Sequence, residues 1–215
     1  MTLFNGEIES LARCWGQPGL FEKQIAVAPG LTEEMVRDFF SDRWGEVVMV
    51  IRRAVDGRVW VMTKEGFPRK LYSLPTGGIR RHEAVAEALR RELTEETGFE
   101  MQVQRFLAAI RYVPVVASGD PQDVPAFASF CFLLEERSGQ DPVVSNGEKI
   151  LDFKAVTPTE LGTIARQWRE LSGSSDEFHD LAAWGEFRGL VHQVVSEALS
   201  SKPSAGYNLR EAERN

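Results

Sequence analysis

The segment 77–99 ends in an acidic run that a stable helix would ordinarily avoid. Glu92, Glu95 and Glu96 come just before Gly98, a residue type that favours the end of a helix. Carboxylates at that end face the negative pole of the helix dipole, and glutamates four positions apart repel each other. Local rules are broken in this way mainly where side chains serve a function, so the segment predicts a functional site.

At about 100° per residue, the same segment predicts an amphipathic helix that begins at His82. Its apolar stripe consists of Ala84, Val85, Ala88, Leu89 and Leu93. Glu92 projects near the middle of that stripe, and Glu96 also lies within it. Glu95 falls on the flank of the stripe, and Arg91 falls on the outer side of the helix. A solvated acidic face would instead place these glutamates opposite the stripe.

Carboxylates on a core-facing stripe need compensation, because burial without a partner drives them to the neutral form. Clustered carboxylates are usually offset by a hard divalent cation with oxygen ligands. The pattern therefore predicts a site for Mg²⁺ or Mn²⁺. Arg91 and Glu95 are spaced as an i,i+4 pair, so we expect these two side chains to contact each other.

The spacing of this segment resembles the Nudix box. The matching residues are Gly77, Glu83, Arg91, Glu92, Leu93, Glu95, Glu96, Gly98 and Phe99. The resemblance implies an α/β fold, the Nudix α/β/α sandwich with a mixed sheet, to which this chain adds an N-terminal extension and C-terminal helices. It also implies hydrolysis of a pyrophosphate bond in a nucleoside diphosphate linked to another moiety. Water activated by a base and by Mg²⁺ or Mn²⁺ would attack phosphorus.

The resemblance also implies roles for individual residues of the box. Glu92 and Glu96 would bind the metal directly, and Glu95 would be a metal ligand or the base. Glu83 would be a supporting acid at the start of the helix, and Arg91 would hold Glu95 in place. The backbone carbonyl of Thr76 would complete the metal shell.

The catalytic base is not fixed by the box. Some members of the family place it in a loop just before the strand that precedes the C-terminal helices. In this chain that loop contains Glu148, which is a further candidate. Asp120 and Asp123 are weaker candidates, because aspartates are common in polar turns.

The substrate is less constrained than the reaction. The candidate phosphate-binding residues are Arg52, Arg69, Arg80 and Arg111, and each is also explained as a surface cation. Tyr112 is one of the aromatic residues that could stack on a base. The N-terminal extension resembles the layout of ADP-ribose and nucleotide-sugar pyrophosphatases, which are often homodimers. The alternatives are a housecleaning nucleoside triphosphate pyrophosphohydrolase and a sensor that binds a nucleotide metabolite without hydrolysing it.

Strand and helix patterns outside the box agree with this fold class. Strands are predicted at 47–52, 58–63, 71–74, 102–116, 126–135 and 150–156, the first two as a hairpin with Asp56-Gly57 in its turn. Helices are predicted at 158–172, after the N-cap Thr157, and at about 176–200. The apolar stripe of the last helix is typical of a core or of a dimer surface. The N-terminal part predicts an amphipathic segment around Ile8, Leu11, Ala12 and Trp15, a strand at 21–28 and a helix at 32–40.

Three parts follow from this pattern: an extension packed on the core at 1–45, the Nudix domain with its C-terminal helices at 46–200, and a frayed tail at 201–215. The net charge of −7 argues against nucleic acid as a partner and leaves a nucleotide-derived small molecule as the expected one. Cys14 and Cys131 lack metal-ligand spacing, and Cys131 is expected to be a buried thiol. The sequence shows no membrane span and no leader, so we expect a cytoplasmic protein without a membrane partner.

Overall fold

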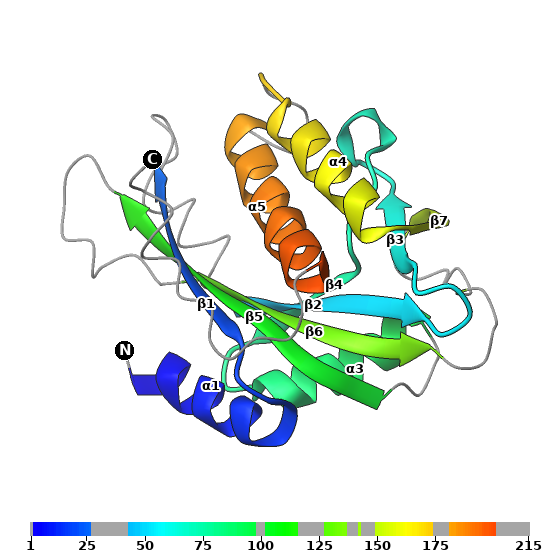
Figure 1. The fold of residues 1–215 in the computed structure, drawn as a ribbon. Coiled ribbons are helices and arrows are strands. Elements are labelled where there is room, and N and C mark those ends of the chain that lie inside the picture. Colours follow the sequence, from blue (N-terminus) through cyan, green and yellow to red (C-terminus); the bar gives the residue numbers. More distant parts are fainter. Residues whose placement is uncertain are drawn as a thin grey trace.

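The computed structural model of the protein describes residues 2–26, 43–97, 102–115, 127–136, 142, 149–173 and 181–200. Its centre is a seven-stranded mixed sheet (Figure 1). The strands are β1 (Gly19–Ala26), β2 (Arg43–Arg53), β3 (Val59–Lys64), β4 (Thr76–Arg80), β5 (Gln102–Val115), β6 (Phe127–Glu136) and β7 (Ile150–Val156). They lie in the order β1-β5-β6-β2-β3-β7, and β4 pairs with the first half of β2. The pairs β1–β5 and β2–β6 are parallel, and the others are antiparallel.

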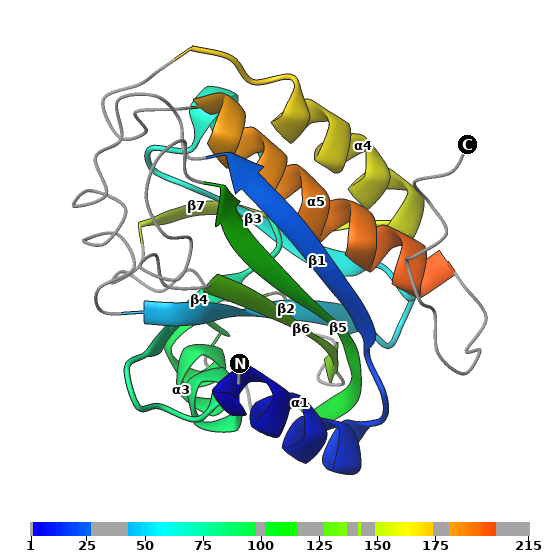
Figure 2. The same cartoon turned by 90° about the vertical axis from the view of Figure 1, so that its left-hand side faces the viewer.

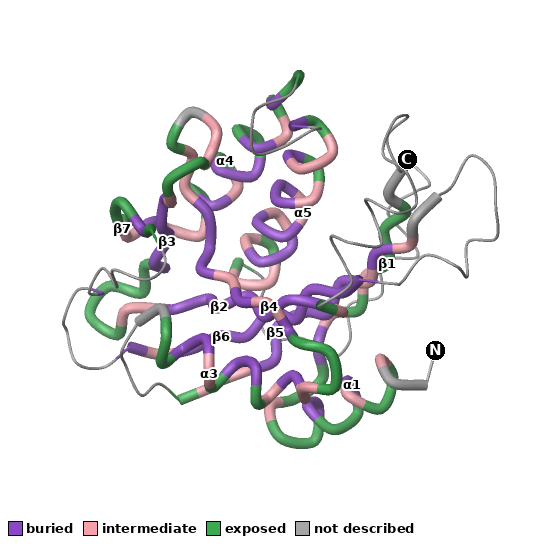
Figure 3. Tube along the Cα trace, turned by 180° about the vertical axis from the view of Figure 1, so that it is seen from behind, coloured by how far each residue is buried: buried purple, intermediate pink, exposed green. Residues whose placement is uncertain are grey.

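Helices cover both faces of the sheet. The helices α1 (Thr2–Trp15) and α3 (Val85–Thr97) lie on one face, and α4 (Pro158–Arg169) and α5 (Leu181–Ser200) lie on the other (Figures 1 and 2). Strands covered by helices on both faces should contain continuous apolar residues rather than alternating apolar and polar residues. Residues 45–51 of β2 are all buried, as is most of β6, which Figure 3 shows as continuous purple stretches. The predicted α/β/α sandwich is confirmed.

Most elements predicted from the sequence are present. The hairpin β2–β3, the strands β5, β6 and β7, and the helix α4 agree with the predictions. Thr157 is the N-cap of α4, and its hydroxyl accepts a hydrogen bond from the backbone N–H of Glu160 (3.2 Å), while the Glu160 carboxylate accepts one from the N–H of Thr157 (2.7 Å). The apolar stripe of α5 is core, since Leu181, Val191, Val194 and Val195 are buried.

Two predicted boundaries are wrong. The box helix begins at Val85 rather than at His82, because His82 adopts a left-handed φ of 67° in the turn before the helix. The strand predicted at 71–74 is reduced to one isolated bridge between Ser73 and Met62. The strand lies instead at β4, which includes Gly77 and Gly78 although glycine disfavours strands.

The first 26 residues contribute to the same sheet and core. β1 pairs with β5 from Gly19↔Ala108 to Ala26↔Val115. On α1, Ile8 and Leu11 join the core cluster that also contains the apolar residues of α3. Three predicted segments lie outside the described residues: the helix at 32–40, the first part of the last helix at 176–180, and the tail at 201–215.

A buried histidine ties α5 to the segment that leads into the box. The backbone N–H of Leu74 donates to His192 Nε2 (3.0 Å), and His192 Nδ1 lies 2.6 Å from the carbonyl oxygen of Arg188. Since a carbonyl only accepts, Nδ1 carries the proton and the ring is neutral. The Trp168 indole N–H donates to the carbonyl of Tyr72 (2.8 Å), so α4 and α5 both hold residues 72–74 in place.

This histidine predicts acid sensitivity of the fold. Burial lowers the pKa of His192 from 6.5 to about 4. Below pH 6.5 His192 binds a proton in the unfolded chain but stays neutral in the folded chain. The contribution of the neutral His192 to the free energy of unfolding is therefore complete above pH 6.5 and is lost as the pH falls towards 4. Its size is on the order of 3 kcal/mol. Urea unfolding between pH 4.5 and 7.5 should show a flatter pH dependence for His192→Gln than for the unmodified protein. If the free energy of unfolding changes equally with pH in both proteins, His192 is not the source of the acid sensitivity.

Candidate functional site

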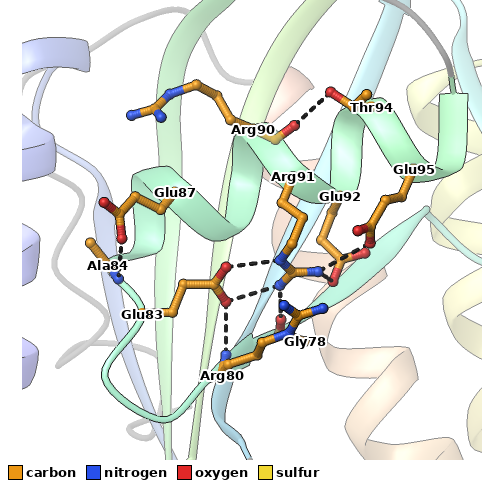
Figure 4. Close-up of polar contacts among 10 residues, drawn as sticks. All are labelled: Gly78, Arg80, Glu83, Ala84, Glu87, Arg90, Arg91, Glu92, Thr94 and Glu95. Atoms are coloured by element: carbon orange, nitrogen blue, oxygen red, sulfur yellow. Dashed lines mark hydrogen bonds and ion pairs between the residues drawn. The ribbon is translucent and has the colours of Figure 1, made fainter.

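Arg91 lies at the centre of the carboxylates that the box brings together (Figure 4). Its Nε donates to Glu83 Oε1 (2.8 Å), and its Nη2 donates to Glu83 Oε2 (2.9 Å) and to the carbonyl oxygen of Gly78 (2.9 Å). Its Nη1 donates to Glu92 Oε1 (2.6 Å) and to Glu95 Oε2 (3.2 Å). These contacts use every N–H that a guanidinium offers. The predicted Arg91–Glu95 contact is confirmed.

The outward direction predicted for Arg91 is wrong. Its side chain is only 19% exposed, because the long aliphatic stem allows the guanidinium to reach back over the carboxylates. Glu83 and then Glu92 hold its pKa above the ordinary arginine value, so it is a permanent cation. Arg91 therefore offsets part of the negative charge that the sequence gathers here.

Glu83 belongs to the turn before α3 rather than to the helix. Its carboxylate receives both bonds of the Arg91 fork and the backbone N–H of Arg80 (2.9 Å). The bonds from Arg91 and then the backbone bond lower the pKa of Glu83, although burial opposes them. Glu83 is thus an ionised acceptor that orients Arg91 and closes the turn between β4 and α3.

Glu92 lies in a space that only glycine leaves open. It is 7% exposed, as expected for its place on the core-facing stripe. A Cβ added to Gly77 would stand 1.9 Å from Glu92 Cγ and 2.1 Å from Glu92 Cδ. The absent side chain of Gly77 therefore provides the cradle for Glu92. This contact explains why β4 contains a glycine that its strand conformation alone would not favour.

The remaining box residues are placed as follows. Glu95 extends from the exposed side of α3, with 49% of its side chain accessible. Glu96 belongs to α3, but its side chain lies outside the described part of the structure, as does all of Glu148. Thr76 is the first residue of β4, next to Gly77.

The donor chemistry fits a hard divalent cation. Glu92 is fixed and Glu95 is accessible, and Figure 4 shows both carboxylates on the same side of α3 as Gly78. Within the described ranges, His, Cys, Asp and Glu side chains form no group of three that is already arranged for a metal. A cation here would thus draw on the two carboxylates, backbone carbonyls and water, with Glu96 as the further ligand that the box resemblance implies.

Of the four predicted phosphate-binding arginines, one is placed beside the box. Arg80 is exposed at the end of β4, next to Glu83. Arg52 lies near the other end of β2 and pairs with Glu135 (3.1 Å), and Arg111 on β5 pairs with Glu22 on β1 (3.2 Å). For Arg69 the structure describes the backbone, in the short 3₁₀ helix Pro68–Lys70, but not the side chain.

Sequence reasoning missed a second group of polar and aromatic residues close to the box. Glu46 on β2 and Arg188 on α5 form a buried ion pair (3.0 Å) beside a cavity that Gly77 and Gly78 also line. Trp184 and Phe187 line the same cavity, although their spacing on α5 indicated a core or a dimer surface. The partners of the ion pair are 142 positions apart, so no local spacing could reveal them.

The accessory features predicted from composition agree with the structure where it describes them. Cys131 is buried and Cys14 is exposed, and both are free thiols. Burial raises the pKa of the Cys131 thiol. In the described ranges, every helix is too short or too polar to cross a bilayer.

Comparison with known proteins assigns the family. The NUDIX domain model matches residues 43–178, which is more than half of the chain. No curated protein matches the chain. Solved structures that are similar include the dihydroneopterin triphosphate pyrophosphohydrolase of E. coli, with 17% identity, 57% of this chain and 86% of that chain covered, and a TM-score of 0.44. A C. elegans Ap4A hydrolase has 16% identity, coverages of 57% and 85%, and a TM-score of 0.42.

The MutT protein of Methanosarcina mazei Go1 has 16% identity, coverages of 56% and 80%, and a TM-score of 0.40. The assignment to a family rests on the domain match, which spans the sheet from β2 onward, the complete box and α4. This chain therefore belongs to the Nudix family.

Proposed function

We propose that the protein hydrolyses the pyrophosphate bond of a nucleoside diphosphate linked to a second moiety, with Mg²⁺ or Mn²⁺ as cofactor. The observation that carries this proposal is the buried Glu92 carboxylate, held against Gly77 and tied to Glu95 through Arg91. Glu92, Glu95, Glu96 and the Thr76 carbonyl are the residues that would hold the ion. When bound, the ion supplies positive charge for the phosphate oxygens and lowers the pKa of the attacking water.

The side chains around the metal site would position the ligands, accept a proton from water and bind the substrate phosphates. Arg91 has no N–H left for substrate, so it acts as a positioning residue that fixes Glu92 and Glu95 relative to Glu83. Glu95 is the described box carboxylate with the largest accessible area, which suits a group that takes a proton from water. Glu148 stays the alternative base. Arg80, exposed at the end of β4, is placed to meet a substrate phosphate.

As the substrate we favour ADP-ribose or a nucleotide sugar, because an N-terminal extension precedes the domain. The alternative within the same chemistry is a nucleoside triphosphate pyrophosphohydrolase. A sensor that binds a nucleotide metabolite without hydrolysis is less well supported, since all four box glutamates are present. Homodimer formation and a cytoplasmic location stay predictions from the sequence.

A substrate panel tests the proposal. We expect turnover of at least one nucleoside diphosphate derivative in the presence of Mg²⁺ or Mn²⁺, and loss of that turnover when EDTA removes the ion. Chromatography would measure the products: a nucleoside monophosphate with a sugar phosphate from ADP-ribose and nucleotide sugars, and a nucleoside monophosphate with pyrophosphate from nucleoside triphosphates. Glu96→Gln should be nearly inactive on the substrate that is turned over. Full activity of that variant, or no turnover on any compound with either metal, would overturn the enzyme mechanism proposed here.

A further inference from the structure

A cavity of about 280 Å³ lies between α5 and the first residues of β2 and β4. Three aromatic side chains line it, those of Phe127, Trp184 and Phe187. Gly77 and Gly78 line it as well, although Gly77 also contacts Glu92 and the Gly78 carbonyl receives a bond from Arg91. The cavity and the box carboxylates are thus separated by one stretch of glycine backbone.

Arg188 gives this cavity a directed hydrogen-bond donor. Its Nη1 donates to Glu46 Oε2 (3.0 Å), and its guanidinium carbon lies 4.5 Å from the centroid of the Trp184 ring and 5.0 Å from that of Phe187. Its side chain is only 10% exposed. Among the residues that the structure describes, Arg188 Nε has no hydrogen-bond partner. A buried N–H without an acceptor is unfavourable, so the arrangement is suited to a ligand that brings one.

Glu46 is already occupied by protein partners. The Ser129 hydroxyl donates to Glu46 Oε1 (2.8 Å) and lies 3.2 Å from the hydroxyl of Tyr112. A hydroxyl has one proton, so Tyr112 is the donor to Ser129. Burial, and then the charge of Glu46, raises the pKa of Tyr112 well above its ordinary value, which keeps this proton in place. Among the described residues of this network, the polar atom without a partner is Arg188 Nε, which is a donor.

The size and walls of the cavity limit what can occupy it. Complete small-molecule sites enclose roughly 300–1,000 Å³, so this cavity suits one planar moiety rather than a whole dinucleotide. Aromatic walls and a guanidinium favour a flat heterocycle, since bases stack on both kinds of group. An arginine offers only donors, so the edge of the heterocycle that faces it must carry an acceptor.

We propose that this cavity binds the base of the nucleoside against the stacked pair of Trp184 and Phe187, with a ring nitrogen or carbonyl oxygen accepting from the Arg188 guanidinium. Arg188 is then a specificity-determining residue, and Glu46 is the residue that positions it. The inference rests on the proposed function, because it places the base on one side of Gly77 and the pyrophosphate on the other side, beside Glu92.

Binding without metal and without turnover tests this inference separately from the reaction. AMP, GMP and UMP would each be titrated and compared with ribose 5-phosphate, with tryptophan fluorescence and calorimetry as readouts. We expect at least one nucleotide to bind about 10-fold or more tightly than ribose 5-phosphate, as the loss of stacking predicts. Trp184→Phe should remove most of the fluorescence change, because the bound base is expected to lie beside that indole ring. If no nucleotide binds more tightly than ribose 5-phosphate, the inference is wrong.

The charge of Arg188 would be removed together with that of Glu46. Arg188→Met alone would leave a buried carboxylate without its cation and could unfold the protein, whereas Glu46→Gln with Arg188→Met removes both charges at similar volume. The double variant should bind the preferred nucleotide about 10-fold more weakly, and ribose 5-phosphate unchanged. The exposed Arg58→Met is the matched control and should bind as the unmodified protein does. Unchanged nucleotide affinity in a folded double variant would overturn the role of Arg188, and base binding without hydrolysis would overturn only the proposed function.

Discussion

Replacing Glu92 by glutamine is expected to lower kcat by at least about 10²-fold, the loss typical of removing one group that stabilises charge in the transition state. Glutamine has nearly the same shape, and its amide oxygen can still accept from Arg91 Nη1. The charge-assisted part of that bond is lost, so we expect a loss of only about 1 kcal/mol of unfolding free energy. Steady-state kinetics at saturating Mg²⁺ and urea unfolding measure the two effects.

Glu87→Gln is the matched control for this experiment. Glu87 belongs to the same helix and is exposed, and its carboxylate accepts from the backbone N–H of Ala84 (3.3 Å). A glutamine can make the same bond, so kcat should stay within about twofold of the unmodified enzyme, as expected for a surface substitution. Equal losses in the two variants would show that helix charge, rather than the position of Glu92, governs activity.

The second large effect is expected for Gly77→Ala. The new methyl group would overlap with Glu92 Cγ and Cδ, so the carboxylate must leave its cradle. We expect a fall in kcat of about the same size as for Glu92→Gln, and a loss of about 1–3 kcal/mol in unfolding free energy from overpacking. Strand propensity alone predicts the opposite sign for stability, because alanine is favoured over glycine inside a strand.

A double-mutant cycle isolates the contact between these two residues. In the Glu92→Gly background the clash is absent, because this change also removes the Glu92 Cβ that would stand 2.6 Å from the new methyl group, so Gly77→Ala should become neutral or slightly stabilising. Gly162→Ala on α4 is the control, since its nearest neighbour, Ser196 Oγ, would be 3.5 Å from the new Cβ. If Gly77→Ala destabilises equally with and without the Glu92 side chain, the cradle does not explain this glycine.

The parts of the fold that sequence could predict are those where neighbouring residues agree. The apolar runs of β2 and β6 and the stripe of α3 each repeat one preference over many positions, so the elements and the burial of Glu92 were predictable. The strand β4 was not, because its two glycines reflect tertiary contacts rather than strand propensity: Gly77 leaves space for Glu92, and a Cβ at Gly78 would stand 2.8 Å from Arg43 Cδ.

In the candidate site, too, local spacing predicted some residues, and tertiary packing placed others that it could not predict. The box residues lie on one helix and one turn, so their spacing predicted the cluster. The direction of Arg91 was missed, because a helical projection places the Cα atom and not the end of a long flexible side chain. The Glu46–Arg188 pair depends on where α5 lies across β2, which is a property of tertiary packing.

The Gly77-Gly78 backbone, which lies between the cavity and the box carboxylates, also limits how the substrate preference of this protein could be changed. One wall of the cavity is the backbone that positions Glu92, so widening the cavity from β4 would alter turnover together with affinity. Trp184 and Phe187 belong to the opposite wall, because they approach the cavity from α5, where their rings stack on each other and contact Arg188. A new substrate preference is therefore best sought by substitution on the helix, with the strand left intact.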